Sequence, residues 1–160
     1  MLSLYRIPGK LEDSASNLSI DKPPVLMIHS QDWDMTQWIS NEPDKAQAFA
    51  LADAGYDVWM GNNRGSAYSL AHTTLSPKSK EYWDFYQFEM GTIDVPTFID
   101  FILGRTGRSQ LSYIGHSTGN NQFYMAASLQ PKYFSERVNV FISLAPPVFL
   151  KNIDAPIAYH

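Results

Sequence analysis

The sequence contains no cysteine, which excludes two kinds of site at once. A disulfide and a thiolate metal ligand both require a cysteine side chain, so neither can occur within this chain. The chain therefore needs no particular redox compartment in order to fold. This absence is compatible with many locations and identifies none of them.

The chain also lacks a surplus of positive charge. It carries 12 Lys and Arg residues against 16 Asp and Glu residues, for a formal net charge of −4, and no basic stripe runs along it. Binding to nucleic acid is driven largely by the counterions released when Lys and Arg neutralise phosphates. We therefore exclude nucleic acid as a partner.

Long hydrophobic runs are absent as well. No charged segment followed by an apolar one opens the chain, so we expect no signal peptide in it. No apolar run approaches the ~20 residues that span a bilayer, so the sequence predicts no membrane-spanning helix. The cellular compartment is left open.

The composition is that of a folded protein, with 44% hydrophobic and 14% aromatic residues in 160. This length suits one domain with a sizeable core, so we expect a single domain over residues 1–160. Apolar runs predict strands, and three- and four-residue spacing of apolar side chains predicts helices. The predicted strands are 2–7, 24–29, 56–60, 111–114 and 138–144, and the predicted helices are 43–54, 92–103 and 119–129. Their alternation predicts an α/β fold, with a mostly parallel sheet and helices on both faces.

The most informative motif is Gly115-His116-Ser117-Thr118-Gly119, between the fourth predicted strand and the third predicted helix. A serine raised out of a sheet on a strained strand-to-helix turn needs neighbours without side chains two positions before and after it. The motif therefore predicts a nucleophile elbow with Ser117 as the nucleophile. His116 and the two glycines would support the turn.

The partners of such a serine are expected later in the chain. In this architecture an Asp or Glu and then a His follow the serine on later strands, but only 43 residues follow Ser117. We therefore expect the acid and the base of the triad to be absent from this chain, and the later strands of the sheet to be missing.

With the elbow in this setting, the sequence resembles the acid lipases, the gastric and lysosomal lipases and steryl ester hydrolases of the α/β-hydrolase fold. The resemblance implies the N-terminal part of a neutral-lipid ester hydrolase that uses no cofactor or metal and acts on triacylglycerols or steryl esters. It also suggests a secreted, lysosomal or lipid-associated protein. Its carriers are LYRIP (4–8), WISN (38–41), ADAGYDVW (52–59), GNNRG (61–65), SP (76–77), EYW to EM (81–90), DVP (94–96), the elbow (115–119) and LAP (144–146).

The resemblance also implies the oxyanion hole. The backbone N–H groups of Gln31 and Thr118 are the donors that would hold the negative oxygen of a tetrahedral intermediate. Ser30 stands where the family has glycine, and Thr118 stands where it usually has glutamine. If position 30 required a positive φ, a Cβ there would cost on the order of 1 kcal/mol and could tilt the Gln31 amide.

Few residues within the chain could replace the missing triad members. His29 and His116 occupy positions whose ordinary task is loop packing, and His72 and His160 fall in a loop and at the terminus, so none is expected to be the base. Asp94 and Asp154 are the least unsuitable acids, but a charge at a helix start is the ordinary explanation for Asp94, and neither residue lies on a strand after the last predicted one.

Three further groups have a structural interpretation beside a functional one. Asp32 and Asp34 could contact a cation but read as a solvated turn, because hard cations want six or more oxygens. Arg64 could clamp an anion, but a structural hydrogen-bonding role is favoured. The aromatic residues between 82 and 88 could line an acyl pocket, but packing of a helix against the sheet is favoured.

A second hypothesis comes from the missing strands. The outer row of N–H and C=O groups on strand 138–144 would have no partner, and such an edge invites pairing with another chain. We therefore expect self-association or a protein partner across this strand, with Phe141 and Ile142 near the contact. The alternative to an ester hydrolase is accordingly an inactive α/β-hydrolase fragment that serves as a structural or interaction subunit.

Overall fold

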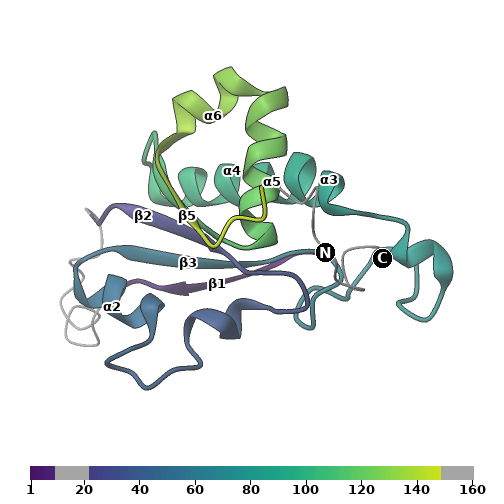
Figure 1. Ribbon diagram of the computed structural model, residues 1–160, viewed down its shortest axis with the longest axis horizontal. Coiled ribbons are helices and arrows are strands. Elements are labelled where there is room, and N and C mark those ends of the chain that lie inside the picture. The colour runs from purple at the N-terminus through teal and green to yellow at the C-terminus, as the bar shows by residue number, and fades with distance from the viewer. Residues whose placement is uncertain (10–21, 149–160) are drawn as a thin grey trace.

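Five strands form one sheet in the computed structural model, which describes residues 1–9 and 22–148 (Figure 1). The strand order across the sheet is β1-β3-β2-β4-β5. The strands are β1 (Ser3–Ile7), β2 (Pro24–Ile28), β3 (Asp57–Asn62), β4 (Leu111–His116) and β5 (Val138–Leu144), and the helices are α2 (Gln47–Asp53), α3 (Gln87–Glu89), α4 (Val95–Thr106), α5 (Thr118–Leu129) and α6 (Pro131–Arg137). The predicted mostly parallel α/β fold is confirmed.

Four of the strands run parallel and one does not. β2 pairs in parallel with β3 and with β4, and β4 pairs in parallel with β5. β1 pairs antiparallel with β3, with Tyr5 opposite Met60. Arg6 fastens this strand, because its Nε and Nη2 reach the two carboxylate oxygens of the buried Asp57 at 2.7 and 3.0 Å. The same carboxylate accepts the Trp59 indole N–H at 2.9 Å.

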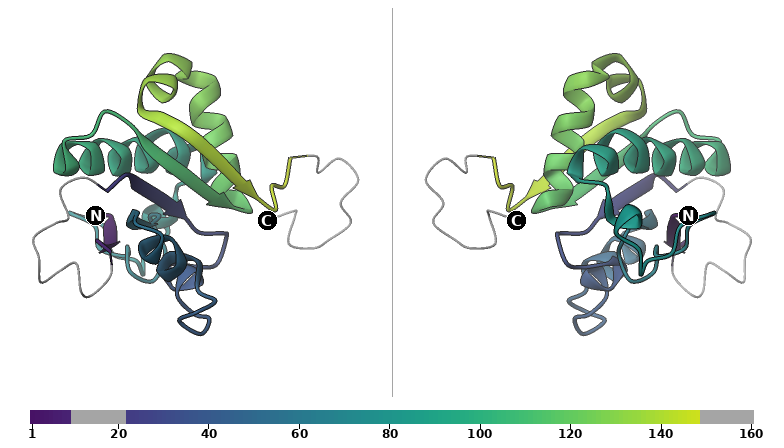
Figure 2. Two further views of the ribbon diagram at one scale, coloured as in Figure 1. Left: turned by 90° about the vertical axis from the view of Figure 1, so that its left-hand side faces the viewer. Right: turned by 90° about the vertical axis from the view of Figure 1, so that its right-hand side faces the viewer.

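Helices cover both faces of the sheet. α4, α5 and α6 lie on one face and α2 lies on the other (Figure 2). The five residues of β2 are all buried, with Leu26 and Ile28 in the core beneath α4 and α5, and Val25 and Met27 in the core beneath α2. Each fully buried aliphatic side chain contributes roughly 1.5–3 kcal/mol to folding. A strand buried on both faces reads as one apolar run, which is why residues 24–29 could be recognised.

The structure differs from the sequence prediction at several boundaries. The helix predicted over 43–54 begins at Gln47, and the helix predicted from 92 begins at Val95, after a π-helical turn over Met90–Asp94. Helix α6 was not predicted. Pro131 occupies its first turn, where proline is tolerated, but its seven residues are too few to show a helical period.

β5 is the outermost strand on its side of the sheet. Its side chains divide between two environments. Phe141 stacks on Phe123 of α5, with ring centroids 4.0 Å apart. Val140 and Ile142 are 47% and 43% exposed. α5 thus covers part of the Phe141 side chain, and the more exposed apolar side chains of this strand are those of Val140 and Ile142. An intermolecular contact near Phe141 and Ile142 stays a prediction.

In the described part of the chain, no helix has the length and apolar character that crossing a membrane requires.

Candidate active site

Ser117 lies on the tight turn that joins the end of β4 to the start of α5. Its backbone dihedrals are φ 50° and ψ −117°, outside the regions that a residue with a Cβ normally adopts. Its N–H donates to the carbonyl of Leu144 at the end of β5, at 2.9 Å. A strained non-glycine residue persists only where the surroundings over-determine it, and such residues cluster at active sites. The predicted strained strand-to-helix turn is confirmed.

The two flanking glycines are required by close backbone approach. A Cβ on Gly119 would lie 2.6 Å from the carbonyl oxygen of Ile28 and 2.9 Å from that of His29. A Cβ on Gly115 would lie 2.9 Å from the backbone nitrogen of Asn120. Because these neighbours are backbone atoms, they cannot rotate away. The start of α5 therefore packs directly against the ends of β2 and β4.

Replacing Gly119 by alanine should lower the free energy of unfolding by about 1–3 kcal/mol, the usual cost of inserting a methyl group into a packed site. Gly104 offers a matched control in the last turn of α4, where an added Cβ meets nothing within 4 Å. Gly104→Ala should instead raise the free energy of unfolding by about 0.5–1 kcal/mol, through helix propensity. Urea denaturation of the three proteins measures both changes. Equal stability of Gly119→Ala and Gly104→Ala would contradict the close approach.

A pocket of about 410 Å³ opens beside the elbow. Gln31 and Thr118, the two residues expected to supply oxyanion donors, both line it, one from the loop after β2 and the other from the first turn of α5. Ser117 is half-buried and directly precedes Thr118. The structure thus places the two residues expected to supply oxyanion donors around one pocket, and Ser117 next to one of them in the chain.

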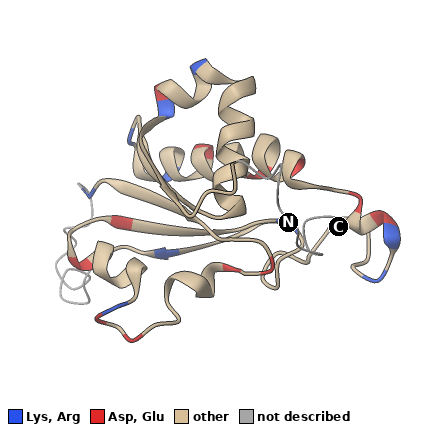
Figure 3. Cartoon of the chain, viewed as in Figure 1, with Lys and Arg blue, Asp and Glu red and all other residues tan. Residues whose placement is uncertain are grey.

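The N-terminus of α5 adds a favourable electrostatic field at this place. The helix has 12 residues, Thr118–Leu129, and none of them is charged (Figure 3). A helix of this length carries a partial positive charge at its first turn, where its free N–H groups point outward. An anion beside Thr118 would be stabilised by that charge, with no acidic residue on the helix to compete for it.

Ser30 does not need the conformation that would have disfavoured a side chain. Among the described residues, positive φ values at non-glycine positions occur only at Asp32, Ser117 and Ala145. The strain considered for position 30 is therefore not present, and the left-handed residue of this loop is Asp32, with φ 58°. The Ser30 hydroxyl and N–H both donate to the side-chain oxygen of Gln37, at 2.9 and 3.0 Å. Gln37 fixes the residue that precedes Gln31.

His29 is committed to holding this loop. Its Nδ1 lies 2.7 Å from the carbonyl oxygen of Ser30, and its Nε2 accepts the backbone N–H of Asn63 at 3.2 Å. Burial lowers the pKa of His29, which favours the neutral ring with its proton on Nδ1. Both ring nitrogens are occupied, so the structural role expected for His29 is supported.

The other described histidines make structural contacts, although Nδ1 of His116 is buried and has no hydrogen-bond partner among the described residues. His72 accepts the backbone N–H groups of Thr74 and Leu75 at 3.1 and 3.0 Å. His116 packs edge-on to Trp38, with centroids 6.4 Å apart. No hydrogen bond joins either ring to the Ser117 hydroxyl in residues 1–9 and 22–148. His160 and Asp154, the remaining candidates, lie outside the described residues.

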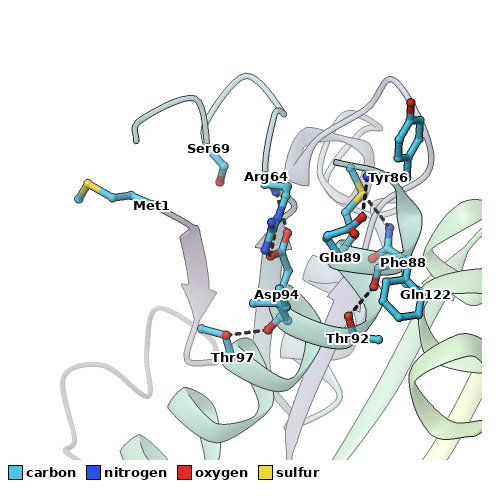
Figure 4. A network of polar contacts seen from close by, with 12 residues as sticks. Met1, Arg64, Ser69, Tyr86, Phe88, Glu89, Thr92, Asp94, Thr97 and Gln122 are labelled. Atoms are coloured by element: carbon cyan, nitrogen blue, oxygen red, sulfur yellow. Dashed lines mark hydrogen bonds and ion pairs between the residues drawn. The ribbon is translucent and has the colours of Figure 1, made fainter. Parts of the chain in front are cut away.

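Arg64, which lines the pocket, is paired with the buried side chain of Asp94 (Figure 4). The Asp94 carboxylate, which is 0% exposed, accepts the Nε and Nη2 groups of Arg64 at 2.9 and 2.6 Å and its backbone N–H at 3.0 Å. The structural role favoured for Arg64 is confirmed. Asp94 directly precedes α4, the helix-start position expected for it, but its side chain makes no capping bond there. The Asp94 carboxylate is therefore bound by Arg64.

The two aspartates after β2 form a turn. Asp34 caps the short 3₁₀ turn Met35–Trp38 by accepting the N–H and hydroxyl of Thr36 at 2.8 and 2.6 Å, and Asp32 is exposed. Across the described ranges, no three His, Cys, Asp or Glu side chains gather closely enough to hold a metal ion. The interpretation as a solvated turn is supported.

The aromatic segment lines the pocket more than it packs against the sheet. Only Tyr82 is buried, and Trp83 and Tyr86 are 47% and 75% exposed. Trp83, Phe85 and Tyr86 all line the pocket. The favoured interpretation, a helix packed on the sheet, is therefore wrong for these three residues. The segment forms a 3₁₀ turn, Lys80–Trp83, followed by an extended connection, and neither buries a continuous face.

The comparison with known proteins agrees with this fold. A family profile described as "alpha/beta hydrolase fold" matches residues 18–158. This chain belongs to that family. Its resemblance to the N-terminal part of the acid lipases is also confirmed. It is 40% identical to human "Lipase member K" over 158 residues, and this alignment covers 98% of this chain and 39% of that protein. It is 44% identical over 152 residues to the bovine "Gastric triacylglycerol lipase", or 94% of this chain and 37% of the relative.

Solved structures show the same fold at lower sequence similarity. An epoxide hydrolase from Vigna radiata superposes with a TM-score of 0.61 at 18% identity, over 99% of this chain and 41% of that one. An esterase from Thermogutta terrifontis superposes with a TM-score of 0.58 at 21% identity, over 98% of this chain and 43% of that one. The chain thus spans about two fifths of the length of the proteins it matches.

Three polar residues at the site were not singled out from the sequence. Gln37 holds Ser30, and Asn63 and Gln122 line the pocket. Asn63 belongs to the glycine-bounded loop 61–65, in which only Arg64 was considered as a functional residue. Gln122 is a polar residue on a buried face of α5. The signal for Gln122 was a glutamine on the helix face that packs into the core, because amide side chains are seldom buried without a hydrogen-bond partner.

Proposed function

We propose that this chain supplies the nucleophile and the oxyanion-binding elements of a carboxylic ester hydrolase of the neutral-lipid type. The observation that carries the proposal is the strained Ser117 turn between β4 and α5. It is flanked by two glycines at which an added Cβ would collide with backbone atoms. The chain's similarity to "Gastric triacylglycerol lipase" and "Lysosomal acid lipase/cholesteryl ester hydrolase" supports a lipid ester as the substrate.

In the proposed reaction, the Ser117 hydroxyl attacks the ester carbonyl while a general base takes its proton. The carbonyl oxygen becomes negative, and the N–H groups of Gln31 and Thr118 hold it. Collapse of this intermediate breaks the bond to the alcohol oxygen, which leaves with the proton from the base, and an acyl group remains on Ser117. Water then releases the fatty acid by the same steps. The base and its acid partner are supplied by sequence outside this chain.

The test is hydrolysis of a p-nitrophenyl ester by the whole protein that carries this chain, compared with its Ser117→Ala variant.

A second candidate function is favoured by the edge strand. The side chains of Val140 and Ile142 lie on the face of β5 that α5 does not cover, and both are close to half exposed. An outermost strand with exposed apolar side chains is a template for pairing with another chain. In this alternative the chain is an inactive interaction subunit whose β5 edge accepts a strand from another polypeptide.

Ile142→Lys is expected to weaken this association, because a buried ammonium at the new interface would lose its hydration. Ser128→Lys on α5 is a matched control, since Ser128 is exposed and lies on a different element. Light scattering should show a loss of oligomer for Ile142→Lys and none for Ser128→Lys. A stable wild-type monomer, with β5 amides that exchange as fast as loop amides, would rule out docking at this edge.

A further inference from the structure

The pocket beside the elbow is lined by two amide side chains whose oxygens have no donor. Gln122 is 1% exposed and Asn63 is 2% exposed. Gln122 Oε1 and Asn63 Oδ1 are both buried and accept no hydrogen bond from the described residues. Buried polar atoms in native proteins are almost always paired with protein, water or ligand. Two amide oxygens without a hydrogen-bond donor, both on residues that line one pocket, indicate a ligand that carries hydrogen-bond donors.

The backbone of Gln122 packs closely against a neighbouring segment. It lies one helical turn after Thr118, so the two side chains share the face of α5 that meets the pocket. The Gln122 side chain lies beside the turn that carries Phe88 and Glu89 (Figure 4). The helix approaches Gly91 so closely that a Cβ there would lie 2.6 Å from the Gln122 carbonyl oxygen.

The amide nitrogen of Gln122 has only a weak partner. It lies 3.7 Å from the sulfur of Met90, and a thioether is a poor acceptor. No stronger bond within the described chain therefore orients the amide. This makes Gln122 a poor choice for packing alone, because an apolar side chain of similar volume would avoid the cost of desolvating the amide.

Asn63 reaches the pocket from the loop after β3. Its backbone N–H is fixed by His29 Nε2 at 3.2 Å, and its carbonyl accepts the Ser66 hydroxyl at 2.8 Å. These bonds hold its backbone, while its side-chain oxygen is left without a donor. The same loop is tied by Arg64 to Asp94, so Asn63 is presented by a rigid segment.

The aromatic part of the pocket has a different character. Trp83 and Phe85 lie with ring centroids 5.9 Å apart, and Tyr86 continues the wall. Aromatic faces bind alkyl chains and reject bare charges other than cations. The pocket therefore suits an amphiphile, with an apolar portion against the rings and hydroxyl donors against the amide oxygens.

We propose that this pocket is a subsite for the alcohol portion of a partial acylglycerol, a glycerol ester that keeps a free hydroxyl. This inference rests on the proposed function. With the ester oxygen at the Thr118 N–H, a group bound by Gln122 lies about one helical turn, ~5.4 Å, further along α5. That span suits a hydroxyl on the glycerol carbons next to the ester. Gln122 Oε1 and Asn63 Oδ1 accept its hydrogen bonds.

The test compares two soluble probes with one acyl group, 1-butyrylglycerol and methyl butyrate, of which only the first has free hydroxyls. Binding to the whole protein is measured by ligand-observed NMR, with Ser117→Ala as background so that neither probe is consumed. We expect 1-butyrylglycerol to bind at least about tenfold more tightly than methyl butyrate. Gln122→Met, which keeps the length but removes the acceptor, should reduce this preference about tenfold. Gln110→Met, the same change at an exposed glutamine, should leave it unchanged.

The outcomes separate this inference from the proposed function. Equal affinity for the two probes, or a preference that Gln122→Met does not alter, would overturn the subsite and would mean that the acceptors hold only water. Wild-type rates of methyl butyrate hydrolysis in Ser117→Ala would overturn the proposed function, whatever the binding preference. Circular dichroism of Gln122→Met checks that it is folded, and Asn63→Leu provides a second variant with the same expected direction.

Discussion

Replacing Ser117 by alanine is expected to lower kcat for ester hydrolysis by a factor on the order of 10⁴ or more in a form of the protein that contains a general base. Loss of the nucleophile leaves only binding and oxyanion stabilisation, which give a small part of the rate. Ser117 occupies the strained turn between β4 and α5, the position at which a nucleophile elbow carries its nucleophile. The measurement is steady-state hydrolysis of p-nitrophenyl butyrate.

Ser128→Ala is the matched control for this experiment. Ser128 lies on the same helix, is exposed, and donates to the Met125 carbonyl at 2.8 Å. Its removal should leave kcat within a factor of about two, because exposed substitutions away from a site have small effects. A Ser117→Ala protein that keeps most of the wild-type kcat would show that another residue is the nucleophile.

Residues 1–160 on their own are expected to hydrolyse p-nitrophenyl esters feebly or not at all, several orders of magnitude below a complete lipase. The reason is that the described histidines make structural contacts and none is hydrogen-bonded to Ser117. Both nitrogens of His29 are occupied, and burial lowers its pKa. His72 accepts backbone N–H groups, and the His116 ring packs on Trp38, with no hydrogen bond to Ser117 in the described part of the chain. A serine without a base is a weak nucleophile.

The terminal His160 is tested separately, because it lies outside the described residues. If residues 1–160 showed steady turnover comparable to that of a complete lipase, and Ser117→Ala abolished it, a base would have to exist within the chain. Loss of that turnover in His160→Ala would then identify it. We expect His160→Ala to have no effect on the residual rate.

The sequence predicted the fold well where buried positions produce a recognisable pattern of apolar residues. β2 is buried along its whole length, and its apolar run was recognised as a central strand. The strained turn at Ser117 was predicted because only glycine satisfies the close approaches at positions 115 and 119. In both cases a local pattern reports a tertiary constraint directly.

Other features could not be predicted because their cause lies in distant residues. The sequence left open whether Ser30 disturbs the oxyanion loop, but Gln37, seven positions later, accepts both its N–H and its hydroxyl. The aromatic residues from Trp83 to Tyr86 were expected to pack, since composition alone does not tell a pocket wall from a core. α6 has too few residues to show a period. Each depends on which segments meet after folding.

The central claim is that Ser117 is an esterase nucleophile, and covalent labelling tests it most directly. The whole protein that carries this chain, with its general base, is incubated with an alkyl fluorophosphonate, which phosphonylates activated serines, and the adduct is located by intact mass and peptide mapping. The account predicts one adduct, on the peptide that contains Ser117, and none in Ser117→Ala. An adduct on a different residue, or no adduct under conditions that label a complete lipase in the same tube, would contradict it.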